Sequence, residues 1–217
     1  MSSEGKPGEG TFEDGSRAER RRGGHVDRVG RPRMTDVTDR PAVARRAVAE
    51  AEVGVSQETL SAIVDGTNPK GDVLSVAELA GVMAGKRTSD LIPLCHPVAL
   101  TDLFVRAVPD RAASAIRVRV ETAAIGPASV DMEALTAAAV AALTVYDMVR
   151  EVDPSAAVRG IKLVSRSGGE SDSWQRAPET GAGQSAGPPR GARVAGRISS
   201  SPGRGAAGRI PPRRYGS

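Results

Sequence analysis

The amino-acid sequence predicts an α+β fold, a ferredoxin-like antiparallel sheet with helices packed on one face. Three observations support this prediction. Residues 103–108 and 115–122 alternate in polarity on either side of a polar turn, as the two strands of a hairpin do. Residues 47–55 and 158–164 add one strand before the hairpin and one after it. Helical segments separate these strands in the order β-α-α-β-β-α-β, which is typical of such a sheet.

The first strand, residues 47–55, is followed by two predicted helices. Ser56 can cap a short helix over about residues 57–65, and Gly66 ends it. Asp72 caps a second helix over about residues 73–86. We expect one apolar stripe of this second helix to pack on the sheet, and that stripe consists of Val73, Val76, Ala80 and Met83.

The second half of the chain contributes the hairpin, a long helix and the last strand. Pro109, Asp110 and Arg111 form the polar turn of the hairpin. Ser129 starts a helix that we expect to run to about residue 152. We expect much of its packing face to consist of Met132, Leu135, Ala139, Leu143 and Tyr146.

Charge divides the 217 residues into an acidic middle and two basic ends. The formal net charge is +4, of which residues 1–33 carry +2 and residues 175–217 carry +7, which leaves −5 for residues 34–174. Both ends have few apolar residues to bury. We therefore expect a disordered leader at 1–33, one domain at 34–174 and a disordered basic Gly/Pro/Arg-rich tail at 175–217. The acidic domain disfavours nucleic acid as a partner, although the tail keeps that alternative open.

The cysteine content and the apolar stretches indicate a cytoplasmic protein. Cys95 is the single cysteine, so no internal disulfide can form, and a reducing compartment suits the chain. We expect no apolar stretch of membrane-spanning length, and residues 1–33 lack the apolar centre of a signal peptide. Aromatic residues make up only 2% of the chain. A hydrophobic core with so few aromatic residues is modest, and contacts between subunits often complete such a core.

Residues 86–97 form the most unusual segment of the sequence. They hold Cys95 and one of the two histidines, His96, between Pro93 and Pro97. Each proline fixes its own φ and favours an extended conformation at the residue before it. We therefore expect Cys95 and His96 on a stiff, non-helical segment. A zinc site is the tempting alternative, but zinc needs three or four ligands. The only other histidine, His25, lies in the leader, so we expect no metal site.

The spacing of two acidic residues in the long helix bears on how a site could be built. Glu133 and Asp147 are fourteen residues apart, so they share nearly the same helical angle and lie about 21 Å apart along the axis. No small substrate can touch both within one subunit. If both serve one site, a second copy of the chain must supply one of them.

Several sequence motifs, in the same order along the chain, are similar to those of the cyclic pyranopterin monophosphate synthases. These enzymes catalyse the second step of molybdenum cofactor biosynthesis. The motifs are Lys-Gly-Asp-Val at 70–73, Leu-Cys-His-Pro at 94–97, Met-Glu-Ala-Leu-Thr-Ala at 132–137 and Leu-Thr-Val-Tyr-Asp-Met at 143–148. The resemblance runs from about Met34 to Trp174, and an alternative start of translation at Met34 is compatible with it.

This resemblance implies a lyase and a set of site residues. The reaction converts (8S)-3',8-cyclo-7,8-dihydroguanosine 5'-triphosphate to cyclic pyranopterin monophosphate and diphosphate. The resemblance also implies a homohexamer, a trimer of dimers, with active sites shared between subunits. No organic cofactor is implied, and Mg²⁺ could accompany the triphosphate. By resemblance the catalytic residues are Asp147, Lys70 and Arg150, and the substrate-binding residues are Leu94, Cys95, His96, Asp131, Met132 and Glu133.

Three residues depart from the pattern of this family. Arg150 and Glu170 replace lysines, and Asp131 replaces a glutamate. An arginine can bind phosphate but keeps its proton, so Arg150 cannot act as an acid or base. The shorter side chain of Asp131 and the reversed charge of Glu170 could lower the activity further. The alternative function is therefore a catalytically impaired paralogue that acts as a ligand-binding or regulatory subunit.

Overall fold

The computed structural model describes residues 25–26, 30–169 and 173–177, all within the unit Met1–Ala177. The predictions for residues 1–24, 27–29, 170–172 and 178–217 lie outside the described residues. They include Glu170 and most of both predicted tails. A few residues at the inner ends of the predicted tails are described. Val26 and Pro32 form an isolated antiparallel bridge, and Gln175 belongs to a strand.

A single antiparallel sheet of five strands forms one layer of the fold. Every neighbouring pair of strands is antiparallel, and the order across the sheet is β2-β3-β1-β4-β5. The first four strands confirm the predicted ferredoxin-like sheet, while the short edge strand β5 was not predicted. The strands are β1 (Val43–Gly54), β2 (Leu100–Asp110), β3 (Ala115–Gly126), β4 (Ala157–Ser167) and β5 (Trp174–Gln175).

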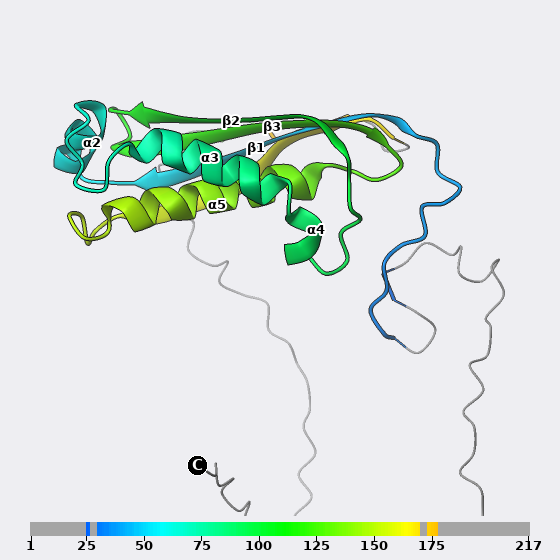
Figure 1. The fold of residues 1–217 in the computed structure, drawn as a ribbon. Helices are drawn as coiled ribbons and strands as arrows, with labels where there is room; N and C mark the ends of the chain where they lie inside the picture. Colours follow the sequence, from blue (N-terminus) through cyan, green and yellow to red (C-terminus); the bar gives the residue numbers. More distant parts are fainter. Residues whose placement is uncertain (1–24, 27–29, 170–172, 178–217) are drawn as a thin grey trace, which may run out of the picture. The chain divides into compact units, whose positions relative to one another are not determined.

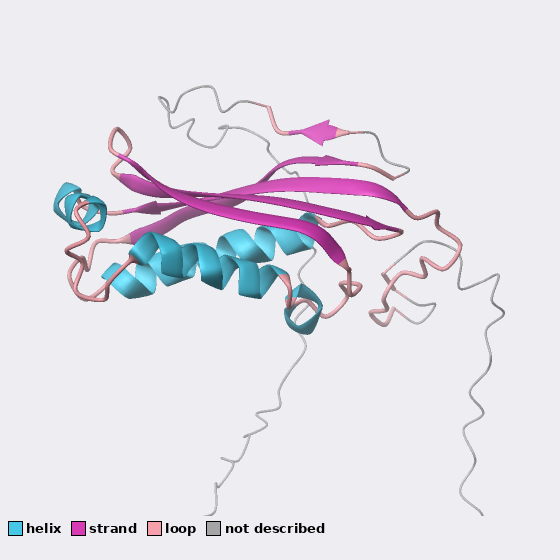
Figure 2. Cartoon of the chain, turned by 45° about the horizontal axis from the view of Figure 1, so that its top comes forward, coloured by secondary structure: helices cyan, strands magenta, loops and turns pink. Residues whose placement is uncertain are grey.

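Two long helices form the second layer. Figure 1 shows α3 and α5 side by side across one face of the sheet, with α2 and α4 near opposite ends, and Figure 2 shows the same two layers from another angle. The helices are α2 (Gln57–Val64), α3 (Val73–Gly85), α4 (Thr88–Leu91) and α5 (Asp131–Val149). The sequence did not predict α4, which is one turn long.

Side chains cap two of the helices as predicted. The Ser56 hydroxyl accepts a hydrogen bond from the Thr59 backbone N–H at the start of α2. The Asp72 carboxylate accepts one from Ser75 N–H at 3.0 Å, and the bonds with Ser75 lower the pKa of Asp72. Ser129, in contrast, does not cap α5. Its hydroxyl donates to the Asp131 carboxylate at 2.6 Å, and the helix begins one residue after Val130.

The predicted packing faces of both long helices are only partly correct: Val73 of α3 is buried and Leu135 of α5 packs against the core, but most of the other predicted residues are not buried. In α3 the buried residues are mainly small ones, namely Val73, Ala77, Gly81, Ala84 and Gly85. Val76 and Met83 are exposed instead. In α5 the buried residues are again mostly small, and Leu143 and Tyr146 lie on the exposed side. Small residues let the helices approach each other closely, because a Cβ on Gly81 would come within 3.2 Å of the Ala141 Cβ.

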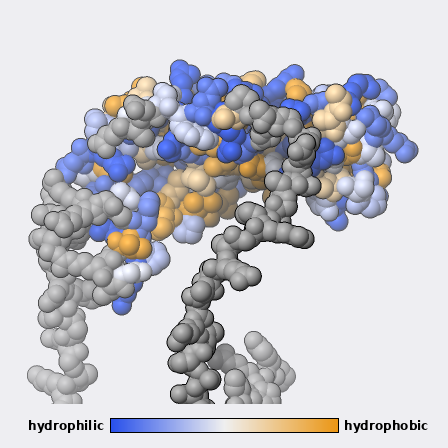
Figure 3. All heavy atoms as spheres, turned by 180° about the vertical axis from the view of Figure 1, so that it is seen from behind, coloured by the Kyte–Doolittle hydropathy of each residue, from blue (hydrophilic) through white to orange (hydrophobic). Residues whose placement is uncertain are grey.

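The large apolar residues that these helices do not bury form part of the molecular surface. Figure 3 shows a band of hydrophobic residues bordered by hydrophilic ones on the face turned to the viewer. The exposed large hydrophobic residues of α3 and α5 are Val76, Leu79, Met83, Leu143 and Tyr146.

Helix α5 is the described helix that bears on the prediction about membrane-spanning stretches. The helix has 19 residues and a mean hydropathy of 1.4, so it is long and apolar enough by length and composition. Within the fold, however, 56% of that stretch is buried. Its apolar residues pack on the sheet and on α3, as those of a core helix do.

A buried aspartate fixes the loop that follows α5. The Asp153 carboxylate accepts hydrogen bonds from Ser56 N–H at 2.7 Å, from the Ser155 hydroxyl at 2.6 Å and from Ser155 N–H at 3.1 Å. Burial raises the pKa of Asp153, but these bonds outweigh it and lower the pKa to about 2. The carboxylate therefore ties the end of α5 to the start of α2.

Replacing Asp153 by asparagine should lower the free energy of unfolding at pH 7 by about 2 kcal/mol. The amide oxygen is a weaker hydrogen-bond acceptor than the carboxylate, and the amide NH₂ group would face the donors of Ser56 and Ser155. The melting temperature should fall by roughly 5–10 °C. Since folding lowers this pKa from 3.8 to about 2, the stabilisation is present above pH 3.8 and is lost as the pH falls through 2. Melts at pH 7, 4 and 2.5 should show the gap between the proteins narrowing, and a gap that is absent at pH 7 would contradict the assignment.

Candidate active site

Three predicted catalytic residues meet at the C-terminal end of α5. The Lys70 ammonium donates to the Asp147 carbonyl oxygen at 2.9 Å and lies 3.8 Å from the Asp147 carboxylate. Arg150 Nε donates to the other carboxylate oxygen at 2.9 Å. Seventy-seven residues separate Lys70 from Asp147, and the fold alone brings them together. We call Lys70, Asp147, Arg150 and Glu151 the Asp147 cluster.

Electrostatics keep Asp147 ionised. The hydrogen bond from Arg150 and the positive charge of Lys70 lower the pKa of the Asp147 carboxyl. In return, Asp147 raises the pKa of Arg150. All three side chains are accessible to a ligand, since Asp147 is 62% exposed, Arg150 52% and Lys70 31%. The cluster offers a carboxylate that can accept a proton and two cations that can contact phosphate.

The predicted substrate-binding residues gather at the other end of α5. Cys95 Sγ donates to Glu133 Oε1 at 3.7 Å, which joins the loop after α4 to the first turn of α5. His96 Nε2 donates to the Thr35 carbonyl oxygen at 2.8 Å. Cys95 and His96 lie outside any helix, as predicted. We call Cys95, His96, Asp131 and Glu133 the Glu133 cluster. The two remaining predicted residues, Leu94 and Met132, are half-buried beside it in sequence.

Burial dominates the chemistry of the Glu133 cluster. Glu133 is only 2% exposed, and its Oε2 has no hydrogen-bond partner within the described part of the chain. Burial raises the pKa of Glu133, and the negative charge of Asp131 adds to the shift. Burial and Glu133 together raise the pKa of the Cys95 thiol to about 11, so this thiol is a donor and not a nucleophile at neutral pH. A buried acceptor without a protein partner needs another donor, which an ordered water or a ligand can supply.

The structure does not bring the two clusters together within one chain. Glu133 and Asp147 belong to the same helix, Asp131–Val149, and fourteen residues of helix separate them by about 21 Å along its axis. The geometry thus agrees with the spacing in the sequence.

Sequence reasoning missed two residues of this region. Arg166 on β4 places Nη1 3.1 Å from the Asp131 carboxylate, and Glu151 contacts Lys70 at 3.0 Å. The helical spacing could have found Glu151, which lies one turn after Asp147. Nothing in the sequence pattern pairs Arg166 with Asp131, because strand register decides that contact.

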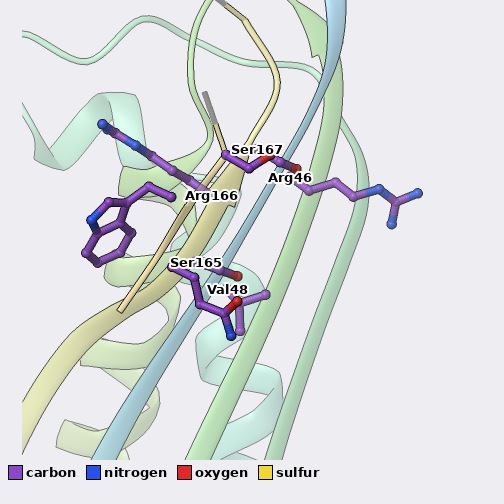
Figure 4. Close-up of a pocket in the computed structure, with 8 residues that line it drawn as sticks. Arg46, Val48, Ser165, Arg166 and Ser167 are labelled. Atoms are coloured by element: carbon purple, nitrogen blue, oxygen red, sulfur yellow. The ribbon is translucent and has the colours of Figure 1, made fainter. Parts of the chain in front are cut away.

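Arg166 also borders a cavity of about 250 Å³ near the edge of the sheet. Figure 4 shows that Arg46 and Arg166 point to opposite sides of the strands there. The cavity is lined by Arg46, Val48, Ser165, Arg166, Ser167, Ser173, Trp174 and Gln175. It contains none of the predicted site residues and is smaller than most ligand pockets.

Two of the three residues that differ from the family pattern lie in these clusters. Arg150 pairs with Asp147, and Asp131 is held between Ser129 and Arg166. Glu170 lies outside the described residues. Among the described residues no group of three or more His, Cys, Asp and Glu side chains is placed to hold a metal ion.

The chain is similar in sequence to a known family and to named proteins. A sequence model of the family described as the MoaC family matches residues 34–169. A protein of Chloroflexus aurantiacus (strain ATCC 29366 / DSM 635 / J-10-fl) is 47% identical over 152 residues, which cover 70% of this chain and 93% of that protein. A protein of Methylobacterium sp. (strain 4-46) is 49% identical over 154 residues, 71% of this chain and 96% of the relative. Both relatives are named cyclic pyranopterin monophosphate synthase.

Proposed function

The chain belongs to the MoaC family, and we propose that it acts in molybdenum cofactor biosynthesis as a cyclic pyranopterin monophosphate synthase. This lyase converts (8S)-3',8-cyclo-7,8-dihydroguanosine 5'-triphosphate to cyclic pyranopterin monophosphate and releases diphosphate. The observation that carries the proposal for this chain is the Asp147 cluster. Lys70 and Arg150 flank one ionised carboxylate there, although Lys70 is distant in sequence.

The two clusters suit different parts of the substrate. Lys70 and Arg150 would hold the triphosphate and neutralise the charge that develops on the leaving diphosphate. Asp147, as a carboxylate, would accept a proton and return it. At the other end of α5, the buried acceptor of Glu133 and the donors of Cys95 and His96 would position the pterin, with Leu94, Asp131 and Met132 beside them.

We propose that one active site uses the Asp147 cluster of one subunit and the Glu133 cluster of another. The support is the separation of about 21 Å along one helix, which a single small substrate cannot span. The exposed apolar residues of α3 and α5 provide surface for subunit contact. A hexamer, a trimer of dimers, would supply such shared sites by symmetry.

The departures are compatible with activity. Arg150 is placed as a phosphate clamp, and the neighbouring Asp147 can carry the proton. The shorter Asp131 side chain is fixed by Ser129 and Arg166, so it has a defined position despite the missing methylene. The relatives are named as enzymes, which favours a catalytic function over that of a non-catalytic subunit.

We propose that the protein needs no organic cofactor. Mg²⁺ would arrive with the triphosphate, whose oxygens are its usual ligands. We also propose a cytoplasmic location, which suits a chain with one free cysteine.

The proposed function is tested by diphosphate release. The purified chain is supplied with the cyclised dihydroguanosine triphosphate, and diphosphate and cyclic pyranopterin monophosphate are both quantified. We expect the two products in equal amounts. Binding of the substrate without release of either product would support the ligand-binding alternative.

A further inference from the structure

Glu151 is the closest carboxylate to Lys70. The Lys70 ammonium lies 3.0 Å from Glu151 Oε1 and 3.8 Å from Asp147 Oδ2. Its third contact is the Asp147 carbonyl oxygen at 2.9 Å. Glu151 lies two residues beyond Val149, the last residue of α5, and it reaches across to the loop before α3, which carries Lys70.

The charges of the Asp147 cluster cancel in the free chain. Lys70 and Arg150 carry two positive charges, and Asp147 and Glu151 carry two negative ones. A triphosphate brings several negative charges to the same place. Asp147 is held by a hydrogen bond from Arg150 at 2.9 Å, whereas Lys70 is the partner shown for Glu151. Because the Glu151 side chain is 66% exposed, little packing opposes its turning into solvent.

We propose that Glu151 is an internal anion that occupies Lys70 in the empty site and is displaced by the triphosphate. This inference rests on the proposed function. Its consequence is that Glu151 limits the affinity of the site for phosphate groups, both those of the substrate and those of the departing diphosphate. Glu151 acts through Lys70 and is not itself a catalytic residue.

The test is the replacement Glu151→Gln, which removes the charge but keeps a side-chain oxygen that can accept from Lys70. We expect KM for the triphosphate substrate and the inhibition constant of inorganic diphosphate each to fall roughly two- to tenfold, without a rise in kcat. Both effects should shrink between about 0.05 and 0.5 M salt, as screening strengthens. A merely structural role would raise KM instead.

Two control variants complete the test. Glu121→Gln breaks another exposed ion pair of 3.0 Å, with Arg119, and should leave both constants unchanged. Glu151→Asp keeps the charge and should stay nearer the wild type than Glu151→Gln does. Unchanged KM and diphosphate affinity in Glu151→Gln would overturn the inference. If the wild type makes no product, the proposed function fails, and calorimetric titration with diphosphate alone still decides the role of Glu151.

Discussion

Replacing Asp147 by asparagine is expected to lower kcat by about 10²- to 10⁴-fold, the usual range for loss of a general acid or base. The physical reason is that the amide keeps the size of the side chain but cannot accept and return a proton. In the wild type, Arg150 and Lys70 lower the pKa of Asp147 and so keep it in the basic form. The fold should not change, because the side chain is mostly exposed. Stopped assays of product formation and a thermal melt measure the two effects.

A matched control separates chemistry from charge. Asp110 also pairs with an arginine, Arg117, at 2.7 Å, and lies at the β2–β3 turn. Asp110→Asn removes the same charge and a similar ion pair, and it should leave kcat within about twofold of the wild type. If Asp147→Asn were as active as this control, Asp147 would not be the proton carrier.

Replacing Arg150 by alanine is expected to raise KM by roughly tenfold to a hundredfold, which is the range for losing a charged hydrogen bond to phosphate. Because Arg150 keeps its proton, kcat should fall much less than KM rises. Steady-state kinetics of the triphosphate substrate separate the two constants.

Arg150→Lys is the control for the kind of contact at this position. Lysine keeps the charge but loses the planar fork, so we expect turnover close to that of the wild type. If Arg150→Lys instead raised the rate by an order of magnitude or more, the position would exchange protons, and the clamp would be the wrong interpretation.

Local signals in the sequence predicted much of the fold. The caps at Ser56 and Asp72 and the patterns that predicted the four long strands depend on neighbouring residues, and the structure confirms the caps and the strands. The helix faces depend on tertiary packing, and there the prediction was only partly correct. A search for a hydrophobic stripe picks out large residues such as Leu143 as the buried ones. In the structure, the close approach of α3 and α5 requires small residues such as Ala141 and Gly81 at the contact.

The residues of the site were predictable only where the sequence carries the motifs of a known family. Those motifs contain Asp147, Lys70 and Glu133. The structure places these residues in the two clusters at opposite ends of α5. Their catalytic and binding roles remain predictions. Arg166 and Glu151 belong to no such motif. The contact of Arg166 arises from strand register, which spacing and composition do not encode, whereas Glu151 lies one helical turn after Asp147 and could have been found by that spacing.

The most direct measurement of a shared site mixes two chains that are each inactive. One chain carries Asp147→Asn and keeps the Glu133 cluster, and the other carries Glu133→Gln and keeps the Asp147 cluster. Co-expressed in equal amounts with different tags, and purified through both tags, they should regain about a quarter of the wild-type rate, because about one site in four then combines two intact halves. Activity no greater than the sum of the separate variants, or full activity of a wild-type monomer in sedimentation-controlled assays, would contradict a site built from two subunits.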